Sequence, residues 1–400
     1  MSERAQEPVQ EQAQWSSRSG LRFIVLFGVV SLFSDMAYEG ARSITGPFLA
    51  SLGASGFVVG AFSGAGEMLG YVVRLISGPA ADRNGRYWPI TLGGYIVQLP
   101  AVPLLGLAGS WPVAGLLMVV ERIGKGIRNP VRGAMLAKAG EDVGVGWGFG
   151  IHEAMDKGGA LIGPLLVGAI LAVSPNDYRR AFAWLAIPVA AALMTLLFLR
   201  LAFPAAGQMV DRLRKGEARE YPPAFWWCSV GAGLLAFGFS DFALIAYHFA
   251  KARVVAGLWI PVFYALALGS GGVGSLFIGR LFDRAGLIVL IPVTIVTSCF
   301  APLVFMGSFD FALAGALLWG IGLGAHESVM SAAVARMFPQ ERRSTAYGIF
   351  MAIFGAAWFV GSAVQGVLYD VSIPALVATA IVAQAAAVVP LWIASRRAGL

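Results

Sequence analysis

Long apolar runs separated by short polar breaks fill the chain from Leu21 to Ala394. Because a helix needs about 20 apolar residues to cross a hydrocarbon core of about 30 Å, counting these runs predicts twelve membrane-spanning helices. Their expected centres form two sets of six: Val30, Ala65, Val97, Gly124, Leu161 and Val189, then Leu234, Leu268, Val296, Gly322, Trp358 and Val382. The pattern therefore predicts an all-α membrane protein.

Composition agrees with a protein that sits in lipid. Of the 400 residues 58% are hydrophobic and 13% are charged, against about 25% charged residues in ordinary soluble domains. The polar first twenty residues hold no apolar core followed by a small-residue cleavage site, so we expect a cytoplasmic tail rather than a removed signal peptide. Cys228 and Cys299 lie in apolar runs, which predicts neither a disulfide framework nor a thiolate metal site.

A long polar stretch divides the chain into two halves. We expect an N-terminal tail at 1–20, a six-helix bundle at 21–203, a cytoplasmic linker at 204–223, a second six-helix bundle at 224–395 and a C-terminal tail at 396–400. Placing both termini in the cytoplasm leaves only Arg179, Arg180, Lys251 and Arg253 outside, so the positive-inside rule selects this orientation.

The two halves carry related motifs in the same order. The segment from Gly78 to Arg86, after the second expected span, reads GPAADRNGR, and the segment from Gly279 to Gly286, after the eighth, reads GRLFDRAG. Phe33-Ser34-Asp35 in the first span recurs as Phe239-Ser240-Asp241 in the seventh. These repeats predict a duplication that produces two pseudo-symmetric bundles.

The loop after the second span carries a family signature. Gly78, Asp82, Arg83, Gly85 and Arg86 match Gly-x-Leu-Ala-Asp-Arg-x-Gly-Arg-Lys, so the chain resembles the major facilitator superfamily. The resemblance implies that this loop is a cytoplasmic gate whose Asp and Arg pair with neighbouring helix ends. The gating residues implied by position in the two copies are Asp82, Arg83, Arg86, Asp283 and Arg284.

The fifth expected span resembles a second signature of this family, Gly-x8-Gly-x3-Gly-Pro-x2-Gly-Gly. It is matched by Gly150, Gly159, Gly163, Pro164 and Gly168. The resemblance implies an antiporter, because the signature is associated with export. Glycines let helices approach closely and a proline bends a helix, so we expect Gly163 and Pro164 to act in gating, together with Asp156. Plain helix packing is the alternative interpretation.

The fourth and fifth expected spans resemble a branch of bacterial facilitators. That branch carries Arg-x-Gly-Lys-Gly-Ile-Arg, matched from Arg122 to Arg128, and His-Arg-Ala-Met-Asp, matched from His152 to Asp156 with Glu153 in place of Arg. The resemblance implies a multi-pass protein of the bacterial cytoplasmic (inner) membrane.

Several ionisable side chains fall inside the expected spans. Each costs about 2.5–3.5 kcal/mol at a span centre, so such groups persist where they are paired or face water. Asp35, Glu39 and Arg42 share one helix face, and by the resemblance spans one, four, seven and ten line a central cavity. We expect proton coupling at Asp35 and Glu39. The expected substrate-binding residues are Arg42, Glu67, Glu121, Lys125, Arg128, Asp241, His326 and Glu327.

Two of these expectations have structural alternatives. Burial favours a neutral carboxyl group and a nearby Arg favours the ionised form, so a small helix movement could switch Asp35 or Glu39 between the two. The alternative is a fixed pair between Glu39 and Arg42. Lys125 and Arg128 could neutralise an anionic substrate, or they could pair with Glu153 and Asp156 of the fifth span.

We therefore expect a secondary active transporter, not an enzyme, that exports a small molecule in exchange for protons by alternating access. Alternatives are proton symport of an organic anion, divalent-metal efflux through Asp35, Glu39, His326 and Glu327, an intramembrane enzyme, and a membrane sensor or scaffold. The expected partners are a small-molecule substrate, protons and the lipid bilayer, with no nucleic acid, cofactor or resident metal. Substrate identity and oligomeric state are left open by the sequence.

Overall fold

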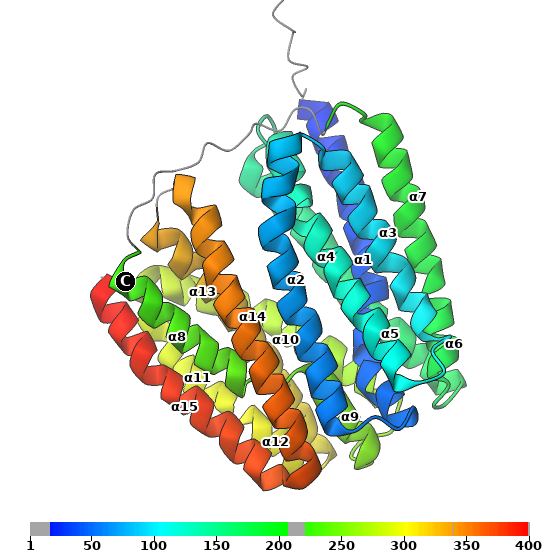
Figure 1. The fold of residues 1–400 in the computed structure, drawn as a ribbon, viewed down its shortest axis with the longest axis vertical. Helices are drawn as coiled ribbons and strands as arrows, with labels where there is room; N and C mark the ends of the chain where they lie inside the picture. Colours follow the sequence, from blue (N-terminus) through cyan, green and yellow to red (C-terminus); the bar gives the residue numbers. More distant parts are fainter. Residues whose placement is uncertain (1–16, 207–220, 339, 399–400) are drawn as a thin grey trace, which may run out of the picture.

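The computed structural model describes the chain except residues 1–16, 207–220, 339 and 399–400, and describes no side chain at 82, 331, 335 or 340–345. The described residues form a bundle of helices in two groups, one before and one after the linker (Figure 1). Each of the twelve expected span centres lies in a helix. The prediction of an all-α fold is confirmed.

The helix bounds follow the two halves of the chain. The first bundle contains α1 (Ser17–Ser51), α2 (Gly56–Asn84), α3 (Tyr87–Leu105), α4 (Trp111–Ala139), α5 (Val145–Val173), α6 (Tyr178–Trp184) and α7 (Ala186–Ala202). The second contains α8 (Pro223–Gly238), α9 (Phe242–Lys251), α10 (Trp259–Ala285), η2 (Gly286–Val289), α11 (Leu290–Ser298), α12 (Phe300–Met306), α13 (Phe309–Met337), α14 (Gln340–Val371) and α15 (Ile373–Ala398).

Local sequence explains how α2 begins and ends. The hydroxyl of Ser55 accepts a hydrogen bond from the Val58 N–H over 3.3 Å, which caps the first turn. Gly85 has a φ of 64°, a left-handed conformation that favours glycine, and its N–H donates to the Ala81 carbonyl over 2.8 Å. The glycine of the loop signature is therefore the residue that ends α2 and turns the chain into α3.

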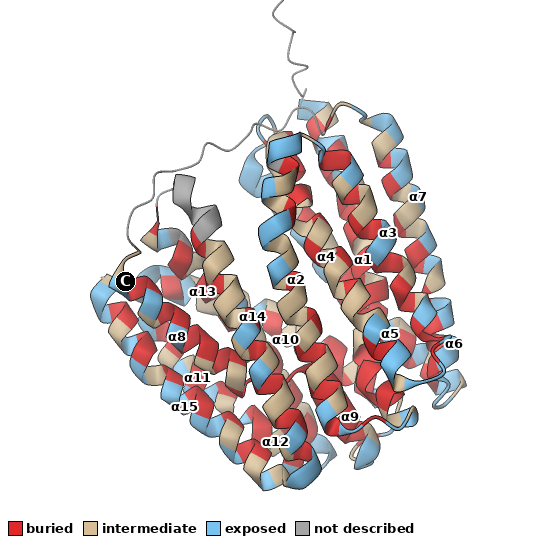
Figure 2. Cartoon of the chain, viewed as in Figure 1, coloured by how far each residue is buried: buried red, intermediate tan, exposed pale blue. Residues whose placement is uncertain are grey.

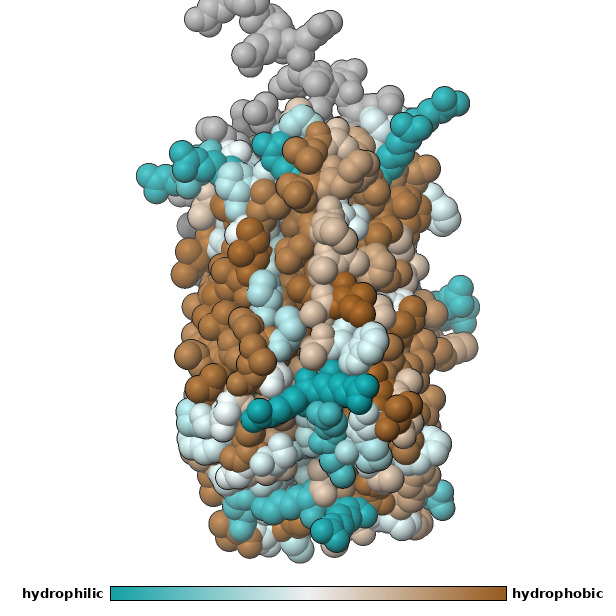
Figure 3. Space-filling view, turned by 90° about the vertical axis from the view of Figure 1, so that its right-hand side faces the viewer, coloured by the Kyte–Doolittle hydropathy of each residue, from teal (hydrophilic) through white to brown (hydrophobic). Residues whose placement is uncertain are grey.

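Much of the chain is suited to a lipid environment. Ten helical segments among the described residues are long and apolar enough to cross a membrane. One of them, Trp259–Met306, has 48 residues, whereas α4 has 29 residues but carries several charges and is not among the ten. Apolar side chains cover the middle of the face seen in Figure 3, and hydrophilic ones gather toward its ends. The protein is a multi-pass membrane protein.

The seventh expected span is interrupted at a repeat motif. The helix α8 ends at Gly238 and α9 begins at Phe242, with Asp241 as its N-cap, accepting the Ala243 N–H over 2.9 Å. The matching Phe33-Ser34-Asp35 segment lies inside the continuous helix α1. The two copies of the sequence motif therefore differ in backbone conformation. The break between α8 and α9 places the Asp241 carboxylate next to Arg42 of the first bundle.

The bundles meet mainly at three helix pairs, α1 with α9, α2 with α14, and α5 with α10, and α9 also contacts α2 and α10 also contacts α1. One close approach involves Gly46 of α1, where an added Cβ would collide with the Ala243 carbonyl oxygen of α9. Side chains on these facing surfaces are largely buried, whereas α7 and α15 carry exposed outer faces (Figure 2).

The two ends of the molecule differ. We call the end where α7 stops and α8 starts the linker end, and the end with the α1–α2 and α9–α10 loops the far end (Figure 1). At the far end the Asp370 carboxylate of α14 accepts the N–H groups of Gly56 and Phe57, each over 2.9 Å. Tyr247 of α9 also donates its hydroxyl to the Ala54 carbonyl over 2.9 Å. The bundles are therefore bonded to each other at the far end.

Candidate functional site

A cavity of about 340 Å³ lies between the two bundles, within the size range of small-molecule sites. Its first-bundle wall is formed by Asp35, Tyr38, Glu39, Arg42, Glu67, Tyr71, Arg74, Arg122, Lys125, Asp156 and Lys157. Its second-bundle wall is formed by Leu323, His326, Glu327, Met330, Phe350, Met351, Phe354 and Trp358. The first wall is charged and the second is mainly apolar and aromatic.

A second cavity continues from the first toward the linker end. It measures about 420 Å³, shares Tyr71, Arg74 and Met351 with the first cavity, and reaches Gly78 and Pro79 near the end of α2. Since the far end is closed by contacts between the bundles, the path from the site leads toward the linker end.

One face of α1 presents polar groups to the cavity. Asp35, Tyr38, Glu39 and Arg42 follow one another at helical spacing and all line it, as expected for the three charged residues. Asp35 and Glu39 are 6% and 9% exposed, so both carboxyl groups are nearly removed from solvent.

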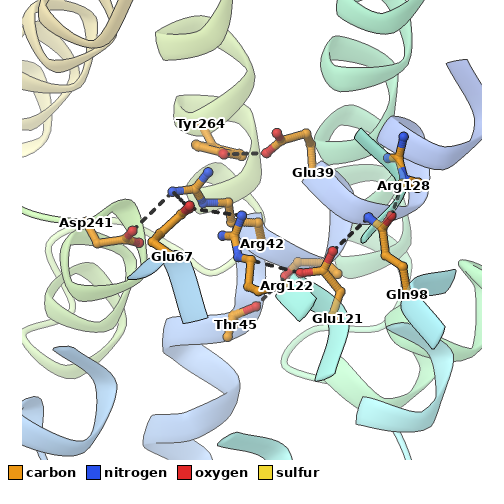
Figure 4. Close-up of polar contacts among 11 residues, drawn as sticks. Glu39, Arg42, Thr45, Glu67, Gln98, Glu121, Arg122, Arg128, Asp241 and Tyr264 are labelled. Carbon is orange, nitrogen blue, oxygen red and sulfur yellow. Dashed lines mark hydrogen bonds and ion pairs between the residues drawn. The ribbon is translucent and has the colours of Figure 1, made fainter. Parts of the chain in front are cut away.

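Two polar contacts cross from α1 to the second bundle (Figure 4). Tyr264 of α10 donates its hydroxyl to Glu39 over 2.5 Å, and Arg42 donates to Asp241 at the start of α9 over 3.1 Å. The alternative of a fixed pair between Glu39 and Arg42 is therefore wrong: each of these side chains takes a different partner from the opposite bundle. Glu39 and Arg42 are placed to respond when the bundles move.

An ion-pair cluster surrounds Arg42. Glu67 of α2 lies 3.5 Å from Arg42 and 2.9 Å from Arg122 of α4, and Arg122 lies 3.6 Å from Glu121. Glu121 and Asp241 line a separate small cavity of about 40 Å³ rather than the central one. Pairing of this kind offsets the cost of burying the charges.

Arg128 lies behind the cavity wall. Its side chain is 0% exposed and donates to Gln98 over 2.5 Å and to Tyr95 over 3.1 Å, while Gln98 donates to Glu121 over 2.8 Å. Asp35 lies 4.0 Å from it. The expectation that Arg128 contacts a substrate in the cavity is therefore corrected: the side chain holds α3 and α4 together and faces Asp35 from the protein side.

The acidic residues of α5 pair differently from the expected arrangement. Asp156 lies 3.6 Å from Arg132, and Glu153 is exposed and lies 3.6 Å from Lys157 one turn along the same helix. The expected ion pairs of these acids with Lys125 and Arg128 are therefore wrong: Asp156 lies beside Arg132, and Glu153 lines a recess with residues of α10 and α13.

Lys125 and Arg74 differ from the other cavity cations. Among the residues whose side chains are described, neither has a carboxylate within ion-pair distance, whereas Lys157 has one and Arg42 and Arg122 each have two. The Lys125 Nζ lies 3.7 Å from the centre of the Tyr38 ring, and the Arg74 guanidinium lies 4.9 Å from that of Tyr71. Each cation therefore lies over an aromatic ring, and its nearest carboxylates act on it from beyond ion-pair distance.

The second-bundle wall contains aromatic rings and unpartnered polar groups. Phe354 lies 5.7 Å from Trp358 and 6.4 Å from Phe350, measured between ring centres. His326 Nε2 and Trp358 Nε1 are buried without a hydrogen-bond partner. The expected residue Glu327 also lines the cavity and is exposed. Together with Lys157 it also lines a neighbouring recess.

The expected gating residues of the loops lie at the linker end. Arg83, Arg86 and Arg284 are exposed, and Asp283 pairs with Arg336 of α13 over 2.8 Å inside the second bundle. The side chain of Asp82 lies outside the described residues. A gating role for this group remains a prediction.

The expected gating residues of α5 pack inside the first bundle. Gly163 lies so close to α1 that an added Cβ would collide with the Met36 carbonyl oxygen, and Pro164 is buried beside it. The glycine thus allows α5 to approach the part of α1 that carries Asp35 and Glu39. This contact supports the packing interpretation of the signature.

Within the described part of the chain, no three His, Cys, Asp or Glu side chains gather closely enough to hold a metal ion. His326 and Glu327 lie on the opposite wall from Asp35 and Glu39. Divalent-metal efflux stays an untested alternative.

Several residues of the site were not foreseen from the sequence. Tyr38 shares the α1 face with Asp35 and Arg42, so helical periodicity could have identified it. Tyr264, Gln98 and Trp358 sit in apolar runs without a distinctive neighbour, and only the packing of separate helices brings them to the site.

A helical membrane body with a polar cavity between two bundles defines the class of membrane transporters. The Major Facilitator Superfamily matches residues 23–326 and 242–399 of the sequence. The chain belongs to this superfamily and is a secondary transporter of its type, in a family of transporters rather than enzymes.

Similar proteins come from bacteria and an archaeon. Uncharacterised proteins of Mycobacterium bovis and Mycobacterium tuberculosis are each 40% identical over 380 residues, which cover 94% of this chain and 93% of theirs. An uncharacterised MFS-type transporter of Methanocaldococcus jannaschii is 24% identical over 360 residues, covering 87% of this chain and 89% of its own.

Solved structures share the fold at low identity. A bacterial homologue of the lysosomal transporter Spinster, inward-facing and unoccupied, has a TM-score of 0.67 at 16% identity, covering 96% of both chains. The peptide transporter POT in complex with sulfate has a TM-score of 0.76 at 15% identity, covering 98% of both chains.

Proposed function

We propose that the protein couples the movement of a small molecule to that of protons, by exposing the cavity alternately to the two ends. The observation that carries the proposal is the position of Asp35 and Glu39. Both are buried carboxyl groups on one face of α1, both line the cavity, and Glu39 is bonded to Tyr264 across the bundle interface.

The chemistry of coupling follows from these contacts. An ionised carboxylate is stabilised by hydrogen-bond donors and by nearby cations, and loses that stabilisation when they move away. Tyr264 belongs to the second bundle and Arg128 to the first, so a rocking movement separates Glu39 from its donor while Asp35 keeps its neighbour. Proton binding at Glu39 is thereby linked to the relative position of the two bundles. Asp35 lines the same cavity as Glu39.

We propose twelve spans with both termini in the cytoplasm of a bacterial cell. The 48-residue segment is long enough to cross twice, once as α10 and once as α11 with α12. Charged residues of α4 such as Glu121 and Arg128 are buried inside the first bundle, away from lipid. We therefore propose that α4 crosses the membrane as well. The positive-inside rule then places the linker end in the cytoplasm, and the cavity leads to that side.

Proton-coupled export is the leading direction, and it rests on the resemblance of α5 to a signature associated with export, although Gly163 itself serves to pack α5 against α1. Proton symport of an organic anion is the second candidate, favoured by Lys125 and Arg74, which lack a carboxylate partner among the described side chains. The two differ in the direction of proton movement when substrate enters a vesicle.

The test uses purified protein in proteoliposomes that contain a pH-sensitive dye, with pools of small molecules added outside. Antiport makes the lumen more alkaline as substrate enters, and symport makes it more acidic. We expect Asp35→Asn or Glu39→Gln to abolish the change, and Glu141→Gln, an exposed acid of the α4–α5 loop, to preserve it. Undiminished proton movement in both cavity variants would overturn the proposal.

A further inference from the structure

The charges around the cavity are neutralised unevenly. Of its carboxylates, Glu39 accepts the Tyr264 hydroxyl, Glu67 lies between two arginines, and Asp156 lies beside Arg132. Asp35 faces Arg128 at 4.0 Å. Four of the five carboxylates that line the cavity therefore already have a donor or a cation from the protein, and the fifth, Glu327, acts electrostatically on Lys157.

Two of the five cations that line the cavity lack a close ion-pair partner in the part of the chain that the structure describes. Lys125 and Arg74 line the cavity from α4 and α2 with no carboxylate in ion-pair range among the described side chains. The tyrosine rings beneath them accept no conventional hydrogen bond, so their N–H groups can donate to an anion that enters the cavity. A carboxylate on a ligand would satisfy them with charge-assisted hydrogen bonds.

The opposite wall has a different chemistry. Phe350, Phe354 and Trp358 form a continuous run of rings on α14, with Met330 and Met351 beside them. Such a wall accepts a flat apolar body by stacking and by excluding water. Trp358 is 4% exposed and its Nε1–H has no acceptor, so it can donate to one polar atom on that body.

Resting on the transport function proposed above, we infer that the substrate is an amphipathic organic acid. Its carboxylate lies toward Lys125 and Arg74, and its aromatic or flat apolar body lies against Phe354 and Trp358. The cavity of about 340 Å³ admits one such molecule. The charged wall belongs to one bundle and the aromatic wall to the other, so binding draws both bundles to the same ligand.

Calorimetric titration of the full-length protein in lipid nanodiscs tests the inference with a matched set of probes. Indoleacetate carries both the ring and the charge, indoleacetamide lacks the charge, tryptamine reverses it, hexanoate lacks the ring, and sulfate is a small inorganic anion. We expect indoleacetate to bind at least about tenfold more tightly than each of the others. Equal binding of the amide, tryptamine, hexanoate or sulfate would overturn the inference.

Variants separate recognition from folding. We expect Lys125→Met to weaken indoleacetate by about tenfold and leave indoleacetamide unchanged, and Lys125→Arg to retain binding. Lys251→Met is the matched control, because Lys251 also lies over a tyrosine ring, 5.1 Å from that of Tyr247, but outside the central cavity. If Lys125→Met weakened acid and amide alike, the assigned role of its charge would be wrong.

The inference and the proposed function fail in different ways. Proton-linked transport of a neutral or cationic compound, with no indoleacetate binding, would refute the inferred substrate class and would still support proton coupling. Binding of the probes in the predicted order, with unchanged proton movement in Asp35→Asn and Glu39→Gln, would refute the proposed proton coupling and would still support the inferred substrate class.

Discussion

Tyr264 of α10 donates its hydroxyl to the carboxylate of Glu39 of α1 over 2.5 Å, which joins the two bundles at the level of the cavity. A hydrogen bond to a charged group contributes about 1.5–3 kcal/mol. Tyr264→Phe should therefore weaken the far-end-closed state described here by at least about tenfold relative to the opposite state. Spin-label distances across the far end measure the populations; an unchanged distribution would show that this bond does not bias the bundles.

The far-end contact of Asp370 gives a second prediction. Its carboxylate accepts two backbone N–H groups at the start of α2, so Asp370→Ala should open the far end. Labelling of a Thr45→Cys variant by a membrane-impermeant maleimide reports this opening, because Thr45 is 6% exposed below the contact. We expect labelling from the far side to rise severalfold. Asp310→Ala, an exposed acid at the start of α13, is the control.

Close helix packing at Gly46 predicts a conformational trap. A side chain there would collide with the backbone of α9 at Ala243, so Gly46→Leu should prevent closure of the far end and stop transport without loss of folded protein. Gly93→Leu is the matched control, because an added Cβ at Gly93 of α3 meets no atom within 4 Å. Normal transport by Gly46→Leu would mean that α1 and α9 need not approach this closely.

Burial of Arg128 predicts a coupling energy with Asp35. Removing one member of a buried charge pair costs about 3–5 kcal/mol, so Arg128→Met should lower the thermal unfolding temperature markedly. In the double variant, Asp35→Asn also removes the unpaired carboxylate that Arg128→Met leaves buried, so part of the lost unfolding temperature should be recovered. Strictly additive effects of the two substitutions on unfolding would show that the 4.0 Å separation carries no interaction.

The sequence predicts the helices because their signal is local. Each of the twelve expected centres lies in a helix, and the repeat motifs mark corresponding positions in the two bundles. It does not predict the break at Asp241, since the same Phe-Ser-Asp motif continues as helix in α1. Asp is a preferred N-cap residue, so the sequence permits a helix to begin after Asp241. The contact between Asp241 and Arg42 of the other bundle then favours the broken form, and that contact exists only in the folded protein.

The site is predicted in part. Periodicity alone places Asp35, Glu39 and Arg42 on the cavity face of α1, because one helix determines their relative positions. Arg128 is misplaced because its direction depends on Gln98 and Tyr95 of α3, which the pattern of α4 does not contain. Partners across helices depend on packing, which a single sequence does not display.

Alternating access is tested most directly by measuring distances at both ends of one protein. With Cys228 and Cys299 replaced, spin labels at Ser51→Cys and Ala252→Cys report the far end, and labels at Asn84→Cys and Ala285→Cys report the linker end. We expect two populations whose proportions change with pH, the far-end distance lengthening as the linker-end distance shortens, and we expect Glu39→Gln to remove the pH response. A single population at both ends that does not respond to pH, or two ends that widen together, would contradict proton-linked rocking around the cavity.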